Sequence, residues 1–270
     1  MASPPKVEIR VDGLYKAFAE QIVLAGIDMT VQRGDVLAIV GGSGCGKTVL
    51  LNHILGMLEP DAGRVRVADH DLPDAPLVDL SDLEEIDIAR LHQHWGMVFQ
   101  RNALFSGTVY DKLSLWLREV REMNEAAIRP IAEQALAAVA LPAKTDFLER
   151  DVNDLSGGMA KRLAVARAIS MAPKVIFYDE PTTGLDPVSS TQIHELIAAT
   201  HENADFPRTT VIITHDKDLL RHLRPRIVML NQGRVFFDGP LREFEASSSP
   251  IVRPYFDLMP MLHQRRRERH

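Results

Sequence analysis

Residues 36–48 read Val36-Leu-Ala-Ile-Val40-Gly41-Gly-Ser-Gly-Cys-Gly-Lys47-Thr48, and this stretch decides the fold. Its apolar half has the length of a strand and no polar face, which is typical of a strand buried inside a parallel sheet. After the loop, apolar residues recur at helical spacing from Val49 to Leu58. A strand, a glycine-rich loop and a helix in this order predict the first unit of a parallel α/β fold.

The loop fits the phosphate-binding pattern G-x-x-x-x-G-K-[ST], here formed by Gly41, Gly42, Ser43, Gly44, Cys45, Gly46, Lys47 and Thr48. Glycines let backbone N–H groups approach phosphate oxygens, and the positive end of the following helix lies beneath them. Lys47 would point its charge at the β- and γ-phosphates, and the Thr48 hydroxyl would ligate Mg²⁺. A flexible glycine linker would not place Lys-Thr at this offset, so we expect ATP and Mg²⁺ as ligands.

Two acidic residues follow a second apolar run, Val175–Tyr178. Asp179 suits a water-mediated hold on Mg²⁺, whereas Glu180 would point elsewhere and could polarise the attacking water. Solvated acids at the end of a strand are the alternative. A phosphate-binding loop earlier in the same chain favours the catalytic interpretation.

The segment Leu155-Ser156-Gly157-Gly158-Met159 opens a helix predicted to run to about Met171. Ser156 has the character of an N-cap, and the two glycines leave the helix start open to an anion. This pattern predicts a second phosphate site. An ordinary capped helix explains the same residues when they are taken alone.

Three single residues gain meaning only from their positions. Gln100 ends a predicted strand, where its side chain could reach a metal ion or the nucleophilic water. His215 ends the predicted strand Thr210–Thr214 and could contact a γ-phosphate. Phe18, or alternatively Tyr15, could stack on a base. Taken alone, each is better explained by a structural role.

The remaining pattern predicts where the other elements lie. Short strands separated by turns are expected at Val7–Val11, Ile22–Leu24, Ile27–Val31 and Met97–Phe99. Residues 102–154 have a helical texture, with one helix at Glu125–Ala140, and predict a helical subdomain inserted at about 102–170. A helix at Ser189–Thr200 and a hairpin around 231–233 follow.

The composition of the 270-residue chain, 46% hydrophobic and 25% charged, is average for soluble globular proteins. A net charge of −6 argues against a nucleic-acid binder. The single cysteine, Cys45, rules out an internal disulfide and favours a reducing compartment. Because no apolar run approaches the ~20 residues of a membrane helix and no secretory signal is evident, we expect a cytoplasmic chain that reaches a membrane through a partner.

Taken together and in this order, the residues resemble the ATP-binding subunits of ABC transporters across residues 7–240. Leu-Ser-Gly-Gly at 155–158, followed by Asp179-Glu180 and then His215, is specific to that family. The resemblance implies that Phe18 stacks on adenine and that residues 41–48 are the Walker A motif. It also implies that Gln100 belongs to the Q-loop and that Asp179-Glu180 ends the Walker B motif. Gly184–Asp186 would be the D-loop, and His215 would be the switch histidine. The resemblance implies a P-loop NTPase (RecA-like) core with an N-terminal antiparallel β subdomain and the inserted α-helical subdomain. These would occupy residues 1–245, with a C-terminal extension at 246–270.

The resemblance also implies a mechanism. Two copies would face each other head to tail, so that each ATP lies between the Walker motifs of one copy and Ser156–Gly158 of the other. Glu180 would activate water, with His215 and Gln100 assisting. The implied metal ligands are Thr48, Gln100 and Asp179. A membrane permease would insert a short helix near Gln100–Phe105, where apolar Leu104 and Phe105 suit a groove, so the chain would lie at the cytoplasmic face of the inner membrane.

Three strings, at 41–52, 99–105 and 178–187, are similar to those of the Mla/Mce-associated ATPases, which drive lipid movement in bacterial envelopes. Val49 lacks the hydroxyl that often touches the α-phosphate, at a cost of about 0.5–1.5 kcal/mol, but it is typical of this group. Met159 replaces a frequent Gln and should be tolerated, because Ser156 and the backbone carry the phosphate contact. The tail at 249–256 resembles this group's extension, which reaches toward the other ATPase copy.

Two other interpretations of the function remain open. An importer of solutes such as polar amino acids would have the same motifs, because no residue of the nucleotide site contacts the cargo. A soluble ABC ATPase of DNA repair or translation would usually carry a long coiled coil or a second fused unit, and this sequence has neither. The resemblance to the lipid-transport ATPases implies two further partners: a Mce-type substrate-binding protein and a small accessory subunit. The basic run Arg265–Arg269 is expected to be solvated rather than bound to anionic lipid.

Overall fold

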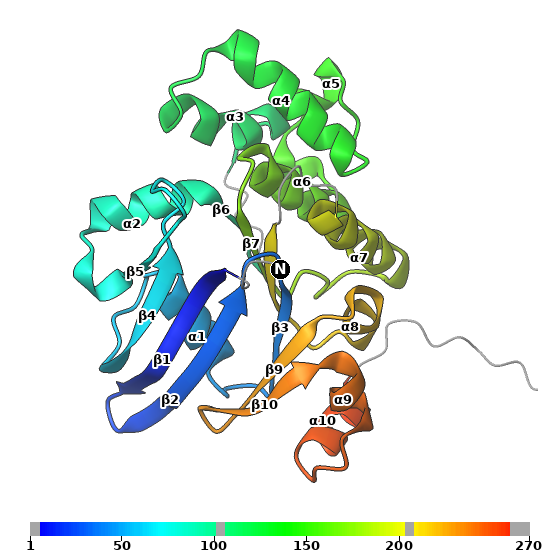
Figure 1. The fold of residues 1–270 in the computed structure, drawn as a ribbon. Helices are drawn as coiled ribbons and strands as arrows, with labels where there is room; N and C mark the ends of the chain where they lie inside the picture. Colours follow the sequence, from blue (N-terminus) through cyan, green and yellow to red (C-terminus); the bar gives the residue numbers. More distant parts are fainter. Residues whose placement is uncertain (1–5, 101–105, 203–207, 260–270) are drawn as a thin grey trace, which may run out of the picture.

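The computed structural model describes residues 6–100, 106–202 and 208–259. Its strands form an antiparallel sheet of four strands and a mostly parallel sheet of six. Figure 1 shows the antiparallel sheet beside the larger one, with α3, α4 and α5 grouped at one end of the molecule. The predicted fold class, a P-loop NTPase core with an antiparallel β subdomain and a helical insertion, is confirmed.

The antiparallel sheet has the order β2-β1-β4-β5. Its strands are β1 (Val7–Phe18), β2 (Gln21–Gln32), β4 (Ala62–Ala68) and β5 (Leu77–Asp79). The expectation of three short strands before residue 35 was wrong, because β1 and β2 are single long strands. Gly13 and Gly26 have positive φ angles, and the β1–β2 register shifts on either side of Leu14, so the glycines bend the ladder without ending it.

The six-stranded sheet has the order β10-β9-β3-β8-β7-β6. Its strands are β3 (Val36–Val40), β6 (Trp95–Val98), β7 (Val175–Asp179), β8 (Thr209–Ile213), β9 (Arg226–Asn231) and β10 (Arg234–Pro240). The run that decides the fold is the interior strand β3, which pairs in parallel with both β8 and β9. The loops after β3, β6, β7 and β8 therefore leave the sheet at one edge, where ligands of open α/β sheets bind.

The helices include one that starts at the phosphate-binding loop and a group that forms a separate subdomain. Their bounds are α1 (Lys47–Ile54), α2 (Glu85–Leu91), α3 (Val109–Glu119), α4 (Glu125–Ala138), α5 (Thr145–Leu148), α6 (Gly157–Ser170), α7 (Pro187–Glu202), α8 (Lys217–Leu223), α9 (Leu241–Ala246) and α10 (Val252–Leu258), with 3₁₀ turns at Leu80–Asp82, His92–His94 and Val152–Asp154. The first, α1, starts at the phosphate-binding loop. Helices α3–α5 form the helical subdomain, which α6 joins to the sheet (Figure 1).

The core follows the two-residue period of the buried strands. In β3, Leu37 and Ile39 pack with α1 and the antiparallel sheet, whereas Ala38 and Val40 pack with α9 and α10. Both faces of this strand are therefore covered, as its apolar run predicted. Within the described ranges, no helix is long and apolar enough to cross a membrane.

Candidate functional site

A cavity of about 420 Å³ opens at the carboxyl edge of the parallel sheet. It is lined by Gly41, Gly42, Ser43, Lys47, Glu180, His215, Tyr255, Leu258 and Met259. The first six follow the carboxyl ends of three adjacent parallel strands, β3, β7 and β8. The structure therefore brings the phosphate-binding loop together with the predicted base and the predicted switch histidine.

The loop has the open backbone that phosphate binding requires. A Cβ atom at Gly42 or Gly44 would meet nothing within 4 Å, whereas one at Gly41 would lie 2.5 Å from the Leu230 carbonyl oxygen. Gly44 and Gly46 also have φ angles of 76° and 103°, which side-chain-bearing residues rarely adopt. The loop thus needs glycine for its own path at some positions and leaves space beside others, and it feeds directly into α1.

The Lys47 side chain folds back against the phosphate-binding loop. Its Nζ donates to the carbonyl oxygens of Gly41, at 2.7 Å, and Gly42, at 3.0 Å. The ammonium charge is thereby held next to the N–H groups of the loop, where the β- and γ-phosphates would lie.

The predicted metal ligands are a hydroxyl, a carboxylate and an amide, which together form the oxygen donor set that Mg²⁺ prefers. Burial raises the pKa of Asp179 and the neighbouring Glu180 charge adds to this, while Lys47 and Lys161 oppose it. Thr48 is exposed in the first turn of α1, and Gln100 is exposed just after β6. These residues fit a metal-bound nucleotide, and their joint role as ligands stays a prediction.

Glu180 and His215 form a direct pair in the lining of the cavity. The distance from His215 Nδ1 to Glu180 Oε2 is 2.8 Å. Glu180 has a left-handed backbone, with φ of 47°, which costs an ordinary residue about 1–2 kcal/mol. Its N–H donates to the Ile213 carbonyl oxygen at 2.8 Å, so β8 holds this conformation and aims the carboxylate at His215.

The pairing has an electrostatic consequence. The hydrogen bond to the Glu180 carboxylate raises the pKa of His215, while partial burial acts in the opposite direction. His215 is therefore more readily protonated than a free histidine, and its N–H can hold the carboxylate in place. The geometry suits Glu180 to accept a proton from water and His215 to orient the Glu180 carboxylate.

A buried hydrogen-bond network, which was not predicted from the sequence, lies next to this pair. Asp216 Oδ2 accepts hydrogen bonds from Thr182 Oγ1 at 2.8 Å and, across 2.7 Å, from His194 Nε2. All three side chains are almost fully buried. The loop after Walker B thus connects to the loop that carries His215. The available signal was local, since Asp216 also caps α8 by accepting from the N–H groups of Asp218 and Leu219.

The second glycine motif forms the start of α6, as predicted. Ser156 caps the helix, accepting a hydrogen bond from the Met159 N–H at 3.3 Å, and it is exposed together with Gly157. A Cβ at Gly158 would lie 2.9 Å from Ser189 Oγ, so any larger residue there would require Ser189 to shift. The described residues that line the cavity do not include this segment, so the structure does not bring the two phosphate sites of one chain together.

Phe18 ends β1 and is 45% exposed, with the Lys16 ammonium 5.7 Å from its ring centroid. The paired strand β2 touches the loop directly, because a Cβ at Gly46 would lie 3.0 Å from the Val23 carbonyl oxygen. Tyr15, the alternative, lies mid-strand opposite Ala25. Base stacking by Phe18 and a nucleotide contact of Val49 stay predictions.

Tyr255 of α10 lines the cavity but was not selected as a site residue from the sequence. Its hydroxyl accepts a hydrogen bond from the Gly41 N–H at 2.9 Å and lies 3.2 Å from the Gly41 carbonyl oxygen. The next residue, Phe256, packs under the ammonium of Lys217 at 4.3 Å. The extension expected to reach toward another copy thus packs, in this single chain, against its own phosphate-binding loop.

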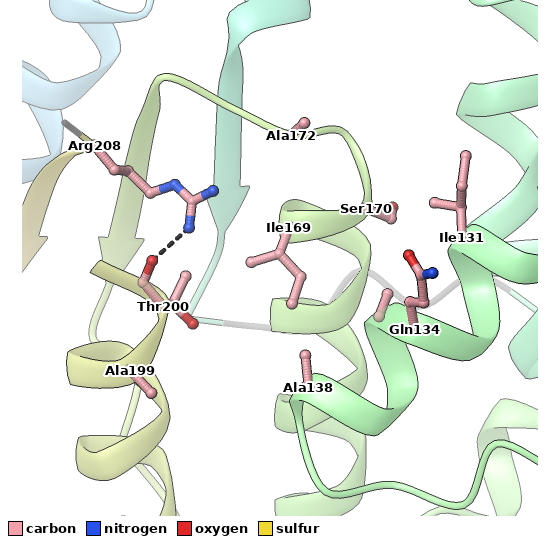
Figure 2. Close-up of a pocket in the computed structure, with 10 residues that line it drawn as sticks. Ile131, Gln134, Ala138, Ile169, Ser170, Ala172, Ala199, Thr200 and Arg208 are labelled. Atoms are coloured by element: carbon pink, nitrogen blue, oxygen red, sulfur yellow. Dashed lines mark hydrogen bonds between the residues drawn. The ribbon is translucent and has the colours of Figure 1, made fainter. Parts of the chain in front are cut away.

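A second cavity, of about 510 Å³, lies between α4, α6 and the end of α7. Figure 2 shows Arg208 there, with its guanidinium directed at Thr200, whose carbonyl oxygen accepts a hydrogen bond from it. Its described lining includes none of the predicted site residues.

Two predictions fall outside the described residues: the docking of Leu104 and Phe105, and the solvated Arg265–Arg269 run.

Comparisons with known proteins agree with this geometry. A family model described as ABC transporter matches residues 24–183. The L-cystine transport system ATP-binding protein TcyN of Escherichia coli (strain K12) is 36% identical over 92% of this chain and 97% of its own length. Protein TRIGALACTOSYLDIACYLGLYCEROL 3, chloroplastic, of Arabidopsis thaliana is 33% identical over 92% of this chain and 73% of its own length. A solved dimeric, post-hydrolysis state of the ATP-binding cassette MJ0796 bound to ADP and Pi is 27% identical, with a TM-score of 0.72 over 87% of this chain and 99% of that one.

Proposed function

The chain belongs to the ABC transporter family as an ATP-hydrolysing, ATP-binding subunit, and on that premise we propose that it powers the movement of phospholipid or another lipid across a bacterial cell envelope. One observation carries the lipid assignment. A relative named after a glycolipid, trigalactosyldiacylglycerol, is 33% identical over 92% of this chain. The three strings similar to the Mla/Mce-associated ATPases, with Val49 after the Lys-Thr pair, support the same assignment.

Hydrolysis follows from the Glu180–His215 pair beside the loop. The β- and γ-phosphates would bind the loop N–H groups and Lys47. A bound Mg²⁺, held by Thr48, Asp179 and Gln100, would neutralise charge on the phosphate oxygens. The Glu180 carboxylate takes the proton of the attacking water as the new bond to the γ-phosphorus forms and the bond to the β-phosphate oxygen breaks, giving ADP and phosphate. The N–H of His215 keeps that carboxylate aimed at the water.

Each complete site would require two copies of the chain in a homodimer. Ser156–Gly158 offers an exposed, capped helix start, which is a ready anion site. Since the cavity of the same chain does not include this segment, a partner copy would supply it to the γ-phosphate. The dimeric MJ0796 cassette, bound to ADP and Pi, supports this arrangement.

A role in transport implies partner proteins and a location at a membrane. An integral membrane permease would dock near Gln100–Phe105 and hold the chain at the cytoplasmic face of the inner membrane. A Mce-type substrate-binding protein and a small accessory subunit would complete a lipid system. Nothing in the mechanism calls for a nucleic acid.

An amino-acid importer is the second candidate. It is favoured by the 36% identity to the L-cystine transport ATP-binding protein, which this chain matches over 97% of that protein's length. The two candidates differ in cargo and share the nucleotide chemistry.

The assembled complex separates the candidates. The chain should be purified with its permease in mild detergent, and the bound lipid should be quantified by mass spectrometry. The lipid proposal predicts stoichiometric phospholipid or related lipid, which ATP releases from the wild-type complex and not from the Glu180→Gln complex. Hydrolysis that rises with L-cystine or histidine, in a complex with no enriched lipid, would establish the importer instead.

A further inference from the structure

Lys161 is a charged side chain buried in the second turn of α6. It is 2% exposed, although lysine is rarely buried without a partner. The same helix begins at Ser156 and Gly157, the segment that would face the nucleotide of a second copy. Lys161 therefore lies one helical turn from the proposed second phosphate site.

The partners of Lys161 lie on another element. Its Nζ donates to the Gln100 carbonyl oxygen at 2.9 Å and to the Phe99 carbonyl oxygen at 3.2 Å. These carbonyls follow the end of β6 at Val98, where the chain leaves the parallel sheet. One ammonium group thus joins the start of α6 to the backbone that carries Gln100.

The surrounding charges show why a cation is held there. Burial lowers the pKa of Lys161, and the negative charge of Asp179 opposes this. Ion–carbonyl hydrogen bonds are stronger than neutral ones, and leaving a buried donor unpaired is costly. The ammonium is therefore bound firmly to the two carbonyls, and it connects α6 to the segment at Gln100.

We propose that Lys161 is a positioning residue, which couples the start of α6 to Gln100 so that engagement of α6 by a second copy sets Gln100 in place for the Mg²⁺-bound nucleotide. The proposal rests on the proposed role of Gln100 as a metal ligand. Lys161 does not touch the nucleotide. It acts by fixing the backbone from which the Gln100 side chain extends.

The test compares Lys161→Met, which keeps the unbranched shape and most of the length but loses the charge, with Lys161→Arg, which keeps a cationic donor. Lys112→Met is the matched control, because Lys112 Nζ also donates to a backbone carbonyl, that of Ser106, but does so on the exposed surface of α3. For each full-length chain, kcat, KM for ATP, the Mg²⁺ concentration for half-maximal hydrolysis and Tm are measured. The same set is measured for Gln100→Ala and for the double variant Lys161→Met with Gln100→Ala.

The coupling predicts that Lys161→Met lowers kcat about tenfold and raises the Mg²⁺ requirement severalfold, with KM for ATP within about twofold of wild type. Lys161→Arg should retain most of the activity, and Lys112→Met should match wild type. The double variant should be no worse than Gln100→Ala, because both changes act through one side chain.

Three results would overturn the coupling. The first is an unchanged kcat and Mg²⁺ requirement in Lys161→Met. The second is an equal loss in Lys161→Met and Lys161→Arg that follows a fall in Tm, since this marks a purely structural lysine. The third is losses that multiply in the double variant. An unchanged Mg²⁺ requirement in Gln100→Ala alone would instead refute the ligand role of Gln100, and the coupling with it.

Discussion

Replacing Tyr255 with phenylalanine tests whether α10 is a structural part of the nucleotide site. The change removes one oxygen atom and keeps the ring. Two contacts are lost, to the N–H and to the carbonyl oxygen of Gly41. Burial raises the pKa of Tyr255 to about 12, so the hydroxyl is neutral at physiological pH and can donate as well as accept.

The two lost contacts do not count equally. The Gly41 carbonyl oxygen still accepts from Lys47 Nζ at 2.7 Å, so its loss of Tyr255 is compensated. The Gly41 N–H loses its acceptor beneath α10, and an unsatisfied buried donor costs about 1–3 kcal/mol. We therefore expect Tyr255→Phe to lower the free energy of unfolding by about 2 kcal/mol, which lowers Tm by roughly 4–8 °C for a chain of this size.

Urea denaturation and differential scanning calorimetry of the full chain would measure both quantities. Tyr110→Phe is the matched control, because the Tyr110 hydroxyl donates to Glu125 on the exposed face of the helical subdomain. This control should change the free energy of unfolding by no more than about 0.5 kcal/mol. If Tyr255→Phe were as mild as Tyr110→Phe, the contact between α10 and the loop would not contribute to the fold in solution.

Two further predictions concern the chemistry. The Glu180 hydrogen bond raises the pKa of His215, so the stabilisation from their pairing should be complete below about pH 6.5 and fade as the pH rises through the raised value. Since the His215 side chain is 48% exposed, His215→Gln should lower the free energy of unfolding by no more than about 1 kcal/mol at pH 6, and by less at pH 9; a larger effect at pH 9 would reverse the sign and refute the pairing. Gly158→Asp would force a Cβ against Ser189 Oγ and place a negative charge where a phosphate should bind, so hydrolysis should fall on the order of a hundredfold while ATP binding to the isolated chain persists. Loss of that binding, measured by calorimetry, would place Gly158 in the site of its own chain.

The phosphate-binding loop could be predicted from the sequence because strand, glycines, Lys47 and helix are contiguous. The N-cap at Ser156 was predictable for the same reason, since its partner is Met159 of the same turn. Local chemistry of this kind is encoded within a few residues.

Contacts that depend on strand order or on distant segments were not predictable in the same way. Glu180 and His215 were each selected, but their pairing requires β7 to lie beside β8 in a particular register. Tyr255 and Gly41 are 214 positions apart, and no periodicity links them. The early strands were predicted too short because turns were expected between them, whereas the positive φ angles of Gly13 and Gly26 accommodate bulges within two long paired strands.

Subunit mixing tests the composite site most directly. Glu180→Gln removes the base beside the loop, and Gly158→Asp blocks the site offered to a partner, so each variant alone should be nearly inactive. In a head-to-tail dimer of one copy of each, the Gly158→Asp copy keeps an intact loop and base and meets the intact Ser156–Gly158 of its partner. Mixing the two in equal amounts without ATP and then adding Mg-ATP should restore roughly a quarter of the wild-type rate, since half the dimers are mixed and each has one working site of two. A mixture that stays as inactive as its components would contradict the shared site.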